Sequence, residues 1–323
     1  MSISAEQEKT LAALNSVGAA VVLTGVKVWV GVATGSLGIL AEAAHSAVDL
    51  LGAVVTFLAV RIAVRPADRD HNYGHGKFEN LSALMETLLL FGTCGWIIYE
   101  SISRLRSGGV HVQASFWAFA VMTLSIVVDI SRSRMLARVA SKHRSQALEA
   151  DALHFSTDIW SSAVVILGLT CVSLAGRHPA LPWLRQADAV AALLVAAIVI
   201  LVSSRLGLRT VQALLDASPE GTPEKVKARV EAVDRVLDCH AIRVRHAGPQ
   251  YFVDLHITLD GALPLREAHA VTERVEKAVE EILPGADVTV HPEPSAAPGS
   301  PAHPDHTRNP QPKTELRKGP SKG

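Results

Sequence analysis

The chain contains 323 residues, 49% of them hydrophobic, and its basic and acidic side chains balance to a formal net charge of zero. This balance, with no basic patch interleaved with aromatic residues, argues against a nucleic-acid partner. Long hydrophobic runs continue to about residue 207, and charged residues recur at short spacing after it, so we expect a membrane part followed by a water-soluble part.

The first part of the chain contains stretches long enough to cross a bilayer, whose core of about 30 Å needs roughly 20 mostly apolar residues for each helix. Six stretches qualify, at about 10–32, 38–63, 80–103, 113–131, 152–174 and 186–207. Residues 1–9 are expected to form a polar lead-in, and no removable signal peptide is predicted. Residues 10–215 therefore form a predicted six-helix transmembrane domain.

Basic residues between the predicted spans indicate the orientation, because Lys and Arg accumulate in cytoplasmic loops. The loops after the second and fourth spans are rich in them, and the loops on the other side carry only Arg104, Arg106, Arg177 and Arg185. Both termini are therefore predicted to be cytoplasmic. The Ala- and Arg-rich composition is typical of a bacterial protein, which predicts the plasma membrane, the inner membrane of a bacterium.

Residues 216–293 change to the pattern of a small soluble domain. Thr222 is a candidate helix cap with Pro223 at the first helical position, and the apolar face of this helix extends to Leu237. Strands are predicted at 240–246 and 250–259, then an amphipathic helix at 265–283 and a strand at 287–291. This order predicts an α+β domain so small that dimerisation or bound metal would support it.

The remaining features are the C-terminal tail and the cysteines. Residues 294–323 lack apolar periodicity and are predicted to be a disordered tail, whose His303 and His306 are expected to be idle or weak metal ligands. The three cysteines, Cys94, Cys171 and Cys239, form no disulfide framework.

Two of the predicted spans carry the same three ionisable side chains. Glu42, His45 and Asp49 occur in the second span, and the fifth span has Asp151, His154 and Asp158 at the same spacing. Offsets of three and four residues place each trio on one helix face. Ionisable groups at bilayer depth are costly and indicate function.

The repeat of this motif in two three-span halves is typical of an inverted-repeat transporter. Facing each other, His45, Asp49, His154 and Asp158 would offer two imidazoles and two carboxylates, a tetrahedral set suited to Zn²⁺. The alternative is a buried hydrogen-bond network between packed helices. The sequence leaves the roles of Glu42 and Asp151 open, and each could serve in packing, in proton relay or as a metal ligand. Asp129, with Arg132 and Arg134 close by in sequence, is predicted to form a structural ion pair near the membrane interface.

These residues resemble the cation diffusion facilitators, a family of metal–proton antiporters, over roughly residues 8–293. The resemblance rests on three segments: Ser36-Leu37-Gly38-Ile39-Leu40 leading to His45 and Asp49, Pro66-Ala67-Asp68 through Asn72-Tyr73-Gly74-His75-Gly76-Lys77, and Glu149-Ala150-Asp151-Ala152-Leu153-His154 through Asp158. The family implies a homodimer of chains that each have six membrane helices and a cytoplasmic ferredoxin-like, metallochaperone-like domain.

The resemblance also implies which residues bind metal. The transport site would be His45, Asp49, His154 and Asp158, and His where many bacterial members have Asp favours Zn²⁺ over Cd²⁺, Fe²⁺ or Mn²⁺. A loop site would use Asp68, His71 and His75. A regulatory cytoplasmic site would use His240, His256, His291 and Glu293, with His269 on the second helix, although Pro292 departs from the family pattern and puts a second ion in doubt. Lys77 and Asp216 would form an inter-subunit ion pair.

The predicted function is export of divalent metal, Zn²⁺ before Cd²⁺, Co²⁺, Fe²⁺ or Mn²⁺, by alternating access coupled to protons. Zn²⁺ would be both substrate and regulatory ligand, and no other cofactor is expected. An intramembrane metalloenzyme would need an HExxH motif or clustered histidine boxes, which the sequence lacks, so the chain is predicted not to be an enzyme. A proton-coupled transporter of small organic cations and a membrane-tethered metal sensor remain alternatives.

Overall fold

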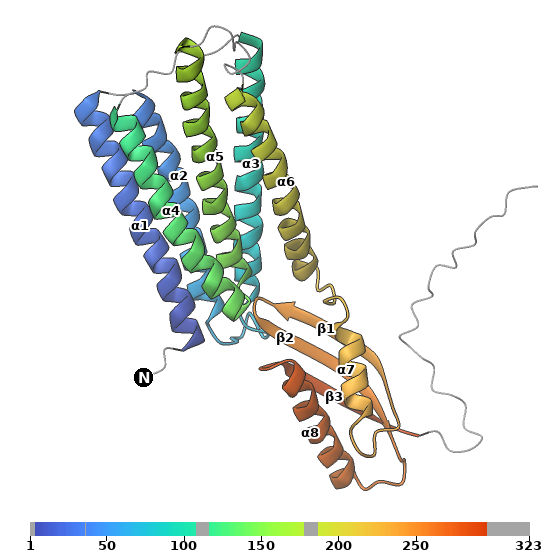
Figure 1. Ribbon diagram of the computed structural model, residues 1–323. Coiled ribbons are helices and arrows are strands. Elements are labelled where there is room, and N and C mark those ends of the chain that lie inside the picture. The colour runs from blue at the N-terminus through green and yellow to red at the C-terminus, as the bar shows by residue number, and fades with distance from the viewer. Residues whose placement is uncertain (1–3, 36, 108–115, 178–186, 296–323) are drawn as a thin grey trace, which may run out of the picture. The chain divides into compact units, whose positions relative to one another are not determined.

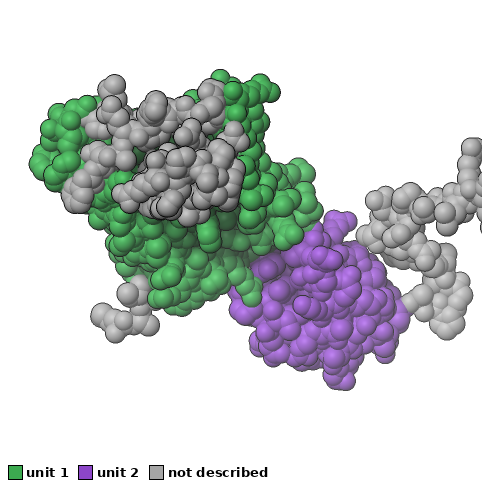
Figure 2. All heavy atoms as spheres, turned by 45° about the horizontal axis from the view of Figure 1, so that its top comes forward, with its two compact units in different colours: residues 1–217, 246–250 green, residues 218–245, 251–323 purple. Residues whose placement is uncertain are grey.

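The computed structural model describes residues 4–35, 37–107, 116–177 and 187–295 (Figure 1). The predicted disordered tail, with His303 and His306, lies outside these residues from position 296 onward. The chain divides into two compact units, residues 1–217 with 246–250, and residues 218–245 with 251–323 (Figure 2).

In its described residues the first unit contains six long helices, which confirms the predicted helical membrane domain. They are α1 (Ala5–Thr34), α2 (Leu37–Ala63), α3 (Lys77–Ser107), α4 (Phe116–His143), α5 (Gln146–Arg177) and α6 (Ala187–Leu214). Within the described residues, α1, α2, α3 and α6 are long and apolar enough to cross a membrane. Large apolar side chains such as Val22, Trp29 and Trp96 are exposed on these helices, as expected for surfaces that face lipid.

The first helix begins earlier than predicted. Ser4 caps it in a reciprocal pair: the Gln7 backbone N–H donates to Ser4 Oγ at 3.2 Å, and the Ser4 N–H donates to Gln7 Oε1 at 3.2 Å. Such a capping box satisfies two backbone donors at a helix start. Residues 5–9, predicted as a lead-in, therefore belong to α1.

The six helices pack in two interlocking groups. α1 packs against α2 and α4, and α3 packs along α6, while α5 contacts α3, α4 and α6 (Figure 1). Small residues occupy many of the contacts, among them Ala12, Ala13, Ala147 and Ala152, which are buried. Small side chains allow helix backbones to approach closely in a membrane. The same packing brings α2 against α5, the two helices that carry the repeated motif.

The second unit has the predicted α+β order. Its elements are α7 (Thr222–Glu231), β1 (Asp238–Ala247), β2 (Gln250–Leu259), α8 (Leu265–Ile282) and β3 (Asp287–Pro294), apart from residues 246–250 at the turn between β1 and β2, which are assigned to the first unit. The sheet order is β1-β2-β3, and β2 pairs with β3 in parallel. One face of α8 and the face of α7 with Val226 and Val230 pack on the sheet to form a single apolar core.

The start and end of α7 differ from the prediction. Gly221, at φ 69°, is the N-cap residue, and no side chain caps the helix, so Thr222 is not the cap. Glycine adopts this left-handed conformation at little cost. The helix ends at Glu231, and Leu237, predicted on its apolar face, lies beyond it and is exposed.

Candidate metal centre

Asp49 of α2 and His154 and Asp158 of α5 form a compact group inside the helical unit. Nε2 of His154 lies 3.2 Å from Oδ1 of Asp49 and 3.6 Å from Oδ2 of Asp158. One ligand atom from each residue lies within 4.8 Å of the others. Two carboxylates and one imidazole nitrogen therefore converge at a spacing that one metal ion can bridge.

His45, the fourth predicted ligand, lies at the edge of this group. Its Nε2 is 3.9 Å from Oδ1 of Asp49, one turn along α2, and its side chain is 45% exposed. The structure thus brings three of the four predicted ligands together tightly and places the fourth beside them. The one-turn spacing in each motif explains why both helices present their ligands on the faces that meet.

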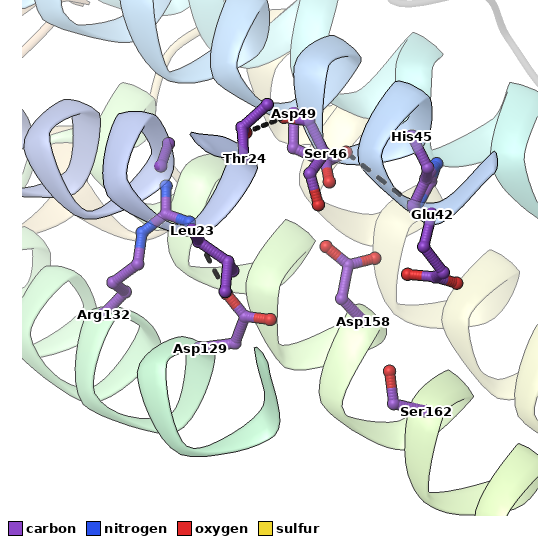
Figure 3. A pocket seen from close by; sticks show the side chains of 11 residues that line it. Leu23, Thr24, Glu42, His45, Ser46, Asp49, Asp129, Arg132, Asp158 and Ser162 are labelled. Carbon is purple, nitrogen blue, oxygen red and sulfur yellow. Dashed lines mark hydrogen bonds and ion pairs between the residues drawn. The ribbon is translucent and has the colours of Figure 1, made fainter. Parts of the chain in front are cut away.

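A polar pocket adjoins the group (Figure 3). Its walls come from α1, α2, α4 and α5, and Asp158 points into it from α5 toward α2 (Figure 3). The lining includes the side chains of Glu42, His45, Ser46, Asp49, Asp129, Arg132, Asp158 and Ser162. Three predicted ligands therefore face a space that an ion could enter, and His154, which contacts two of them, is not among the lining residues.

The three acids that the sequence left open have different surroundings. Glu42 lines the pocket and accepts from Lys27 Nζ of α1 at 3.1 Å. Asp129 forms the predicted ion pair with Arg132 at 3.5 Å, but it lines the same pocket as Asp49 and Asp158. Asp151 is buried and accepts from Ser16 Oγ at 3.2 Å. None of the three belongs to the compact group of ligand atoms.

Two buried charged side chains near the site, Lys27 and Glu86, were not singled out from the sequence, and a third, Arg132, was predicted only as a partner of Asp129. Lys27 is 4% exposed and also donates to Ser46 Oγ at 2.7 Å. Arg132 is 4% exposed and donates to Ser16 Oγ at 3.0 Å. Glu86 of α3 is 1% exposed, with Oε2 3.8 Å from His154 Nδ1. The rule that identified the motifs, an ionisable residue within an apolar span, applies equally to Lys27 and Glu86.

The predicted loop ligands after α2 also lie together. Asp68 is 3.3 Å from Nδ1 of His71 and 3.3 Å from Nε2 of His75, and their ligand atoms lie within 4.8 Å of one another. The His71 backbone N–H donates to the Asp68 carboxylate at 2.7 Å, which lowers the pKa of this carboxyl group. A carboxylate that stays ionised suits metal ligation, although occupation of this loop site stays a prediction.

Most of the predicted cytoplasmic ligands lie close together near the ends of three neighbouring strands in the second unit. Glu293 lies 2.9 Å from His256 Nδ1 and 3.2 Å from His240 Nε2. His291 pairs with His256 in the register of β2 and β3, with ring centroids 4.7 Å apart. His269 is separate from them: it is 71% exposed and its Nε2 lies 3.7 Å from Glu273.

Glu293 is held in its ionised form within this group. Burial raises its pKa, but the hydrogen bond from His256 and the positive charge of His240 outweigh that effect, so the pKa is lowered overall. Cys239, beside His240 in sequence, is fully buried in the domain core, and burial raises the pKa of its thiol to about 11. A protonated core thiol is a poor metal ligand.

Lys77 and Asp216 form an ion pair at 2.9 Å within a single chain. The pair joins the first residue of α3 to a residue just after α6, and a role for it between subunits stays a prediction. These two helix ends meet because α3 and α6 pack along each other. Lys77 also donates to the backbone carbonyl of Leu214 at 3.3 Å.

Comparisons with known proteins place the chain in a family of cation transporters. The sequence model of the cation efflux transmembrane domain matches residues 13–215, and that of the cation efflux protein cytoplasmic domain matches residues 219–295. The chain is 32% identical over 293 residues to the cation-efflux pump FieF of Pectobacterium atrosepticum, covering 89% of this chain and 93% of that protein. It is 33% identical over 285 residues to FieF of Shewanella oneidensis, covering 88% and 93%. A solved structure of CzrB in its zinc form covers 26% of this chain and 98% of that one, at 29% identity and a TM-score of 0.23.

Proposed function

Because the chain belongs to the cation efflux family, we propose that this membrane transporter exports Zn²⁺ from the cytoplasm in exchange for protons. The observation that carries the proposal is the convergence of Asp49, His154 and Asp158 from two helices with matching motifs. With His45 beside them, these residues supply the ligand number and ligand types that Zn²⁺ prefers.

The ligand chemistry supports Zn²⁺ as the first substrate. Imidazole nitrogens suit Zn²⁺, Co²⁺ and Fe²⁺, whereas sets made only of oxygen ligands favour harder ions such as Mn²⁺. A ligand set with His45 is therefore better suited to Zn²⁺ than a set with a carboxylate at that position. Cd²⁺, Co²⁺, Fe²⁺ and Mn²⁺ are the alternative substrates with which Zn²⁺ transport should be compared.

The same ligands supply a chemical basis for proton coupling. Zn²⁺ binds neutral imidazoles and ionised carboxylates, so loading the site releases protons and protonation favours unloading. His45 and His154 can each carry a proton in place of the metal. With alternating access around this site, an inward proton gradient drives metal outward.

The pocket supports a metal substrate over a small organic cation. An organic cation is held by aromatic faces and apolar surface. Of the residues that line this pocket in the described part of the chain, none is Phe, Tyr or Trp, and carboxylates and hydroxyl groups predominate. A membrane-tethered sensor would not need these buried charges, which are costly in a membrane and would serve no purpose in an anchor.

We infer a cytoplasmic location for both termini and a plasma-membrane location for the protein from the basic loops. The second unit then lies in the cytoplasm, where the group of His240, His256 and Glu293 can bind the same metal ions that the transporter exports. We propose that Zn²⁺ bound there stabilises a homodimer and so regulates transport.

The test is Zn²⁺ flux into proteoliposomes under an imposed pH gradient. We expect gradient-dependent movement for the wild-type protein and its loss in Asp49→Ala and in Asp158→Ala. Ser162→Ala is the control, because Ser162 lines the same pocket without belonging to the ligand group. Flux that survives both aspartate substitutions would show that the site is wrong. Zn²⁺ movement that ignores the pH gradient would remove proton coupling from the proposal.

A further inference from the structure

Glu86 is a buried carboxylate on α3 that neither motif contains. Its side chain is 2% exposed, and Oε2 lies 3.8 Å from Nδ1 of His154. Oε1 accepts from the hydroxyl group of Thr56 at 3.4 Å. Within the described part of the chain, His154 is its only ion-pair partner. A carboxylate buried in a membrane without a cation is costly, so its place beside His154 requires a reason.

The two nitrogens of His154 have different surroundings. Nε2 faces the carboxylates of Asp49 and Asp158, where the metal would bind. Nδ1 is buried and has no hydrogen-bond partner among the described residues, and it faces Glu86. A metal-bound histidine almost always donates its other N–H to an oxygen acceptor, which holds the ring in place and strengthens the nitrogen ligand.

Gly52 of α2 leaves room for the carboxylate of Glu86. A Cβ atom at position 52 would lie 2.8 Å from Oε1 of Glu86, and the three nearest atoms to it all belong to that carboxyl group. The backbone of α2 therefore forms one wall against the Glu86 carboxylate, and Thr56 lies one turn further along the same helix. Any side chain at position 52 would displace the carboxylate.

We propose that Glu86 is a positioning residue of the metal site, and that it accepts a hydrogen bond from Nδ1 of His154 while Nε2 binds the metal ion. The proposal rests on the assignment of His154 as a ligand under the proposed function. The proposed hydrogen bond requires the 3.8 Å separation between Oε2 and Nδ1 to shorten to about 3 Å when the metal is bound. α3, which bears neither motif, thereby takes part in metal affinity.

The experiment measures Zn²⁺ dissociation constants on the purified full-length protein by competition with a chelator. A background with Asp68→Ala and His256→Ala removes the other two groups. In that background, Glu86→Gln and Gly52→Ala are each expected to raise the dissociation constant about 10- to 100-fold, the usual range for an outer-sphere partner of a ligand. Gly95→Ala is the matched control, because a Cβ atom there meets nothing within 4 Å.

Two further measurements distinguish a role of Glu86 in positioning His154 from a role in helix packing alone. Gly52→Ala acts by moving the Glu86 carboxylate, so adding it to Glu86→Ala should change the dissociation constant less than about twofold. In flux assays, Glu86→Gln should raise the KM for Zn²⁺ with little change in maximal rate. Because binding is measured without transport, a wild-type protein that binds Zn²⁺ but moves none contradicts the proposed function alone. Unchanged Zn²⁺ affinity in both Glu86→Gln and Gly52→Ala would overturn this inference.

Discussion

A buried ion pair joins three helices of the membrane unit at one end. Nζ of Lys9 on α1 lies 2.6 Å from Oε1 of Glu79 on α3, and the two side chains are 6% and 0% exposed. The hydroxyl group of Ser145, which precedes α5, donates to the other oxygen of Glu79. The same hydroxyl group accepts from the backbone N–H of Leu148 at 3.4 Å, so the charge pair also supports the start of α5.

Replacing Lys9 by Met leaves Glu79 buried without its cation. The attraction between unit charges 2.6 Å apart is about 6 kcal/mol at an effective dielectric constant of about 20, before the cost of desolvating both groups. Removing one partner of a buried pair costs about 3–5 kcal/mol, because the other charge loses its compensation. The double variant Lys9→Met with Glu79→Leu should cost less than either single change, since it leaves no isolated charge.

The free energy of unfolding can be measured in mixed micelles with increasing SDS, followed by far-ultraviolet circular dichroism. The matched control is the ion pair between Arg209 and Glu149, also 2.6 Å long and also between two helices, whose side chains are 56% and 46% exposed. Arg209→Ala should cost about 1 kcal/mol or less. The reasoning is refuted if Lys9→Met costs no more than Arg209→Ala, or if the double variant costs as much as the sum of the singles.

Two further predictions concern the second unit. Replacing His240 and His256 by Ala should abolish the Zn²⁺ dependence of dimer formation in sedimentation experiments and of transport activity, and unchanged Zn²⁺ sensitivity would contradict a regulatory site. Burial raises the pKa of the Cys239 thiol to about 11, so about one thiol in a thousand is ionised at pH 8. In a variant with Cys94→Ala and Cys171→Ala, which leaves Cys239 as the one cysteine, iodoacetamide should therefore label the protein only after it unfolds. The unfolded thiol has a pKa of about 8.5, so the stability that this buried thiol contributes should decline only as the pH rises above that value; fast labelling of the native protein at pH 8 would contradict its burial.

Much of the architecture could be predicted from local patterns. Span length follows from bilayer thickness, and the spacing of His45, Asp49, His154 and Asp158 follows from the helix period, so both are written in short stretches of sequence. The strands and helices of the second unit were predicted for the same reason. Their boundaries shifted where local capping decided them, as at Ser4 and Gly221.

The partners of the isolated charges depended on packing that no local pattern describes. Glu86 and His154 are far apart in the sequence, as are Lys9 and Glu79. Each pair is brought together by the packing of α3 against another helix, α5 for the first pair and α1 for the second. His269 is a residue type that can bind metal, but it lies on α8 and does not belong to the group of His240, His256 and Glu293.

The sequence by itself therefore determined the long membrane helices, the face of each motif and the chemical class of the predicted ligands, because these depend on residue type and helical or strand period. Only the tertiary structure decided which nitrogen of His154 faces the acids, that Glu86 lies behind it, and that Lys77 pairs with Asp216 in the same chain. Those outcomes depend on the rotation and depth of one helix against another, and these result from the packing of many side chains at once.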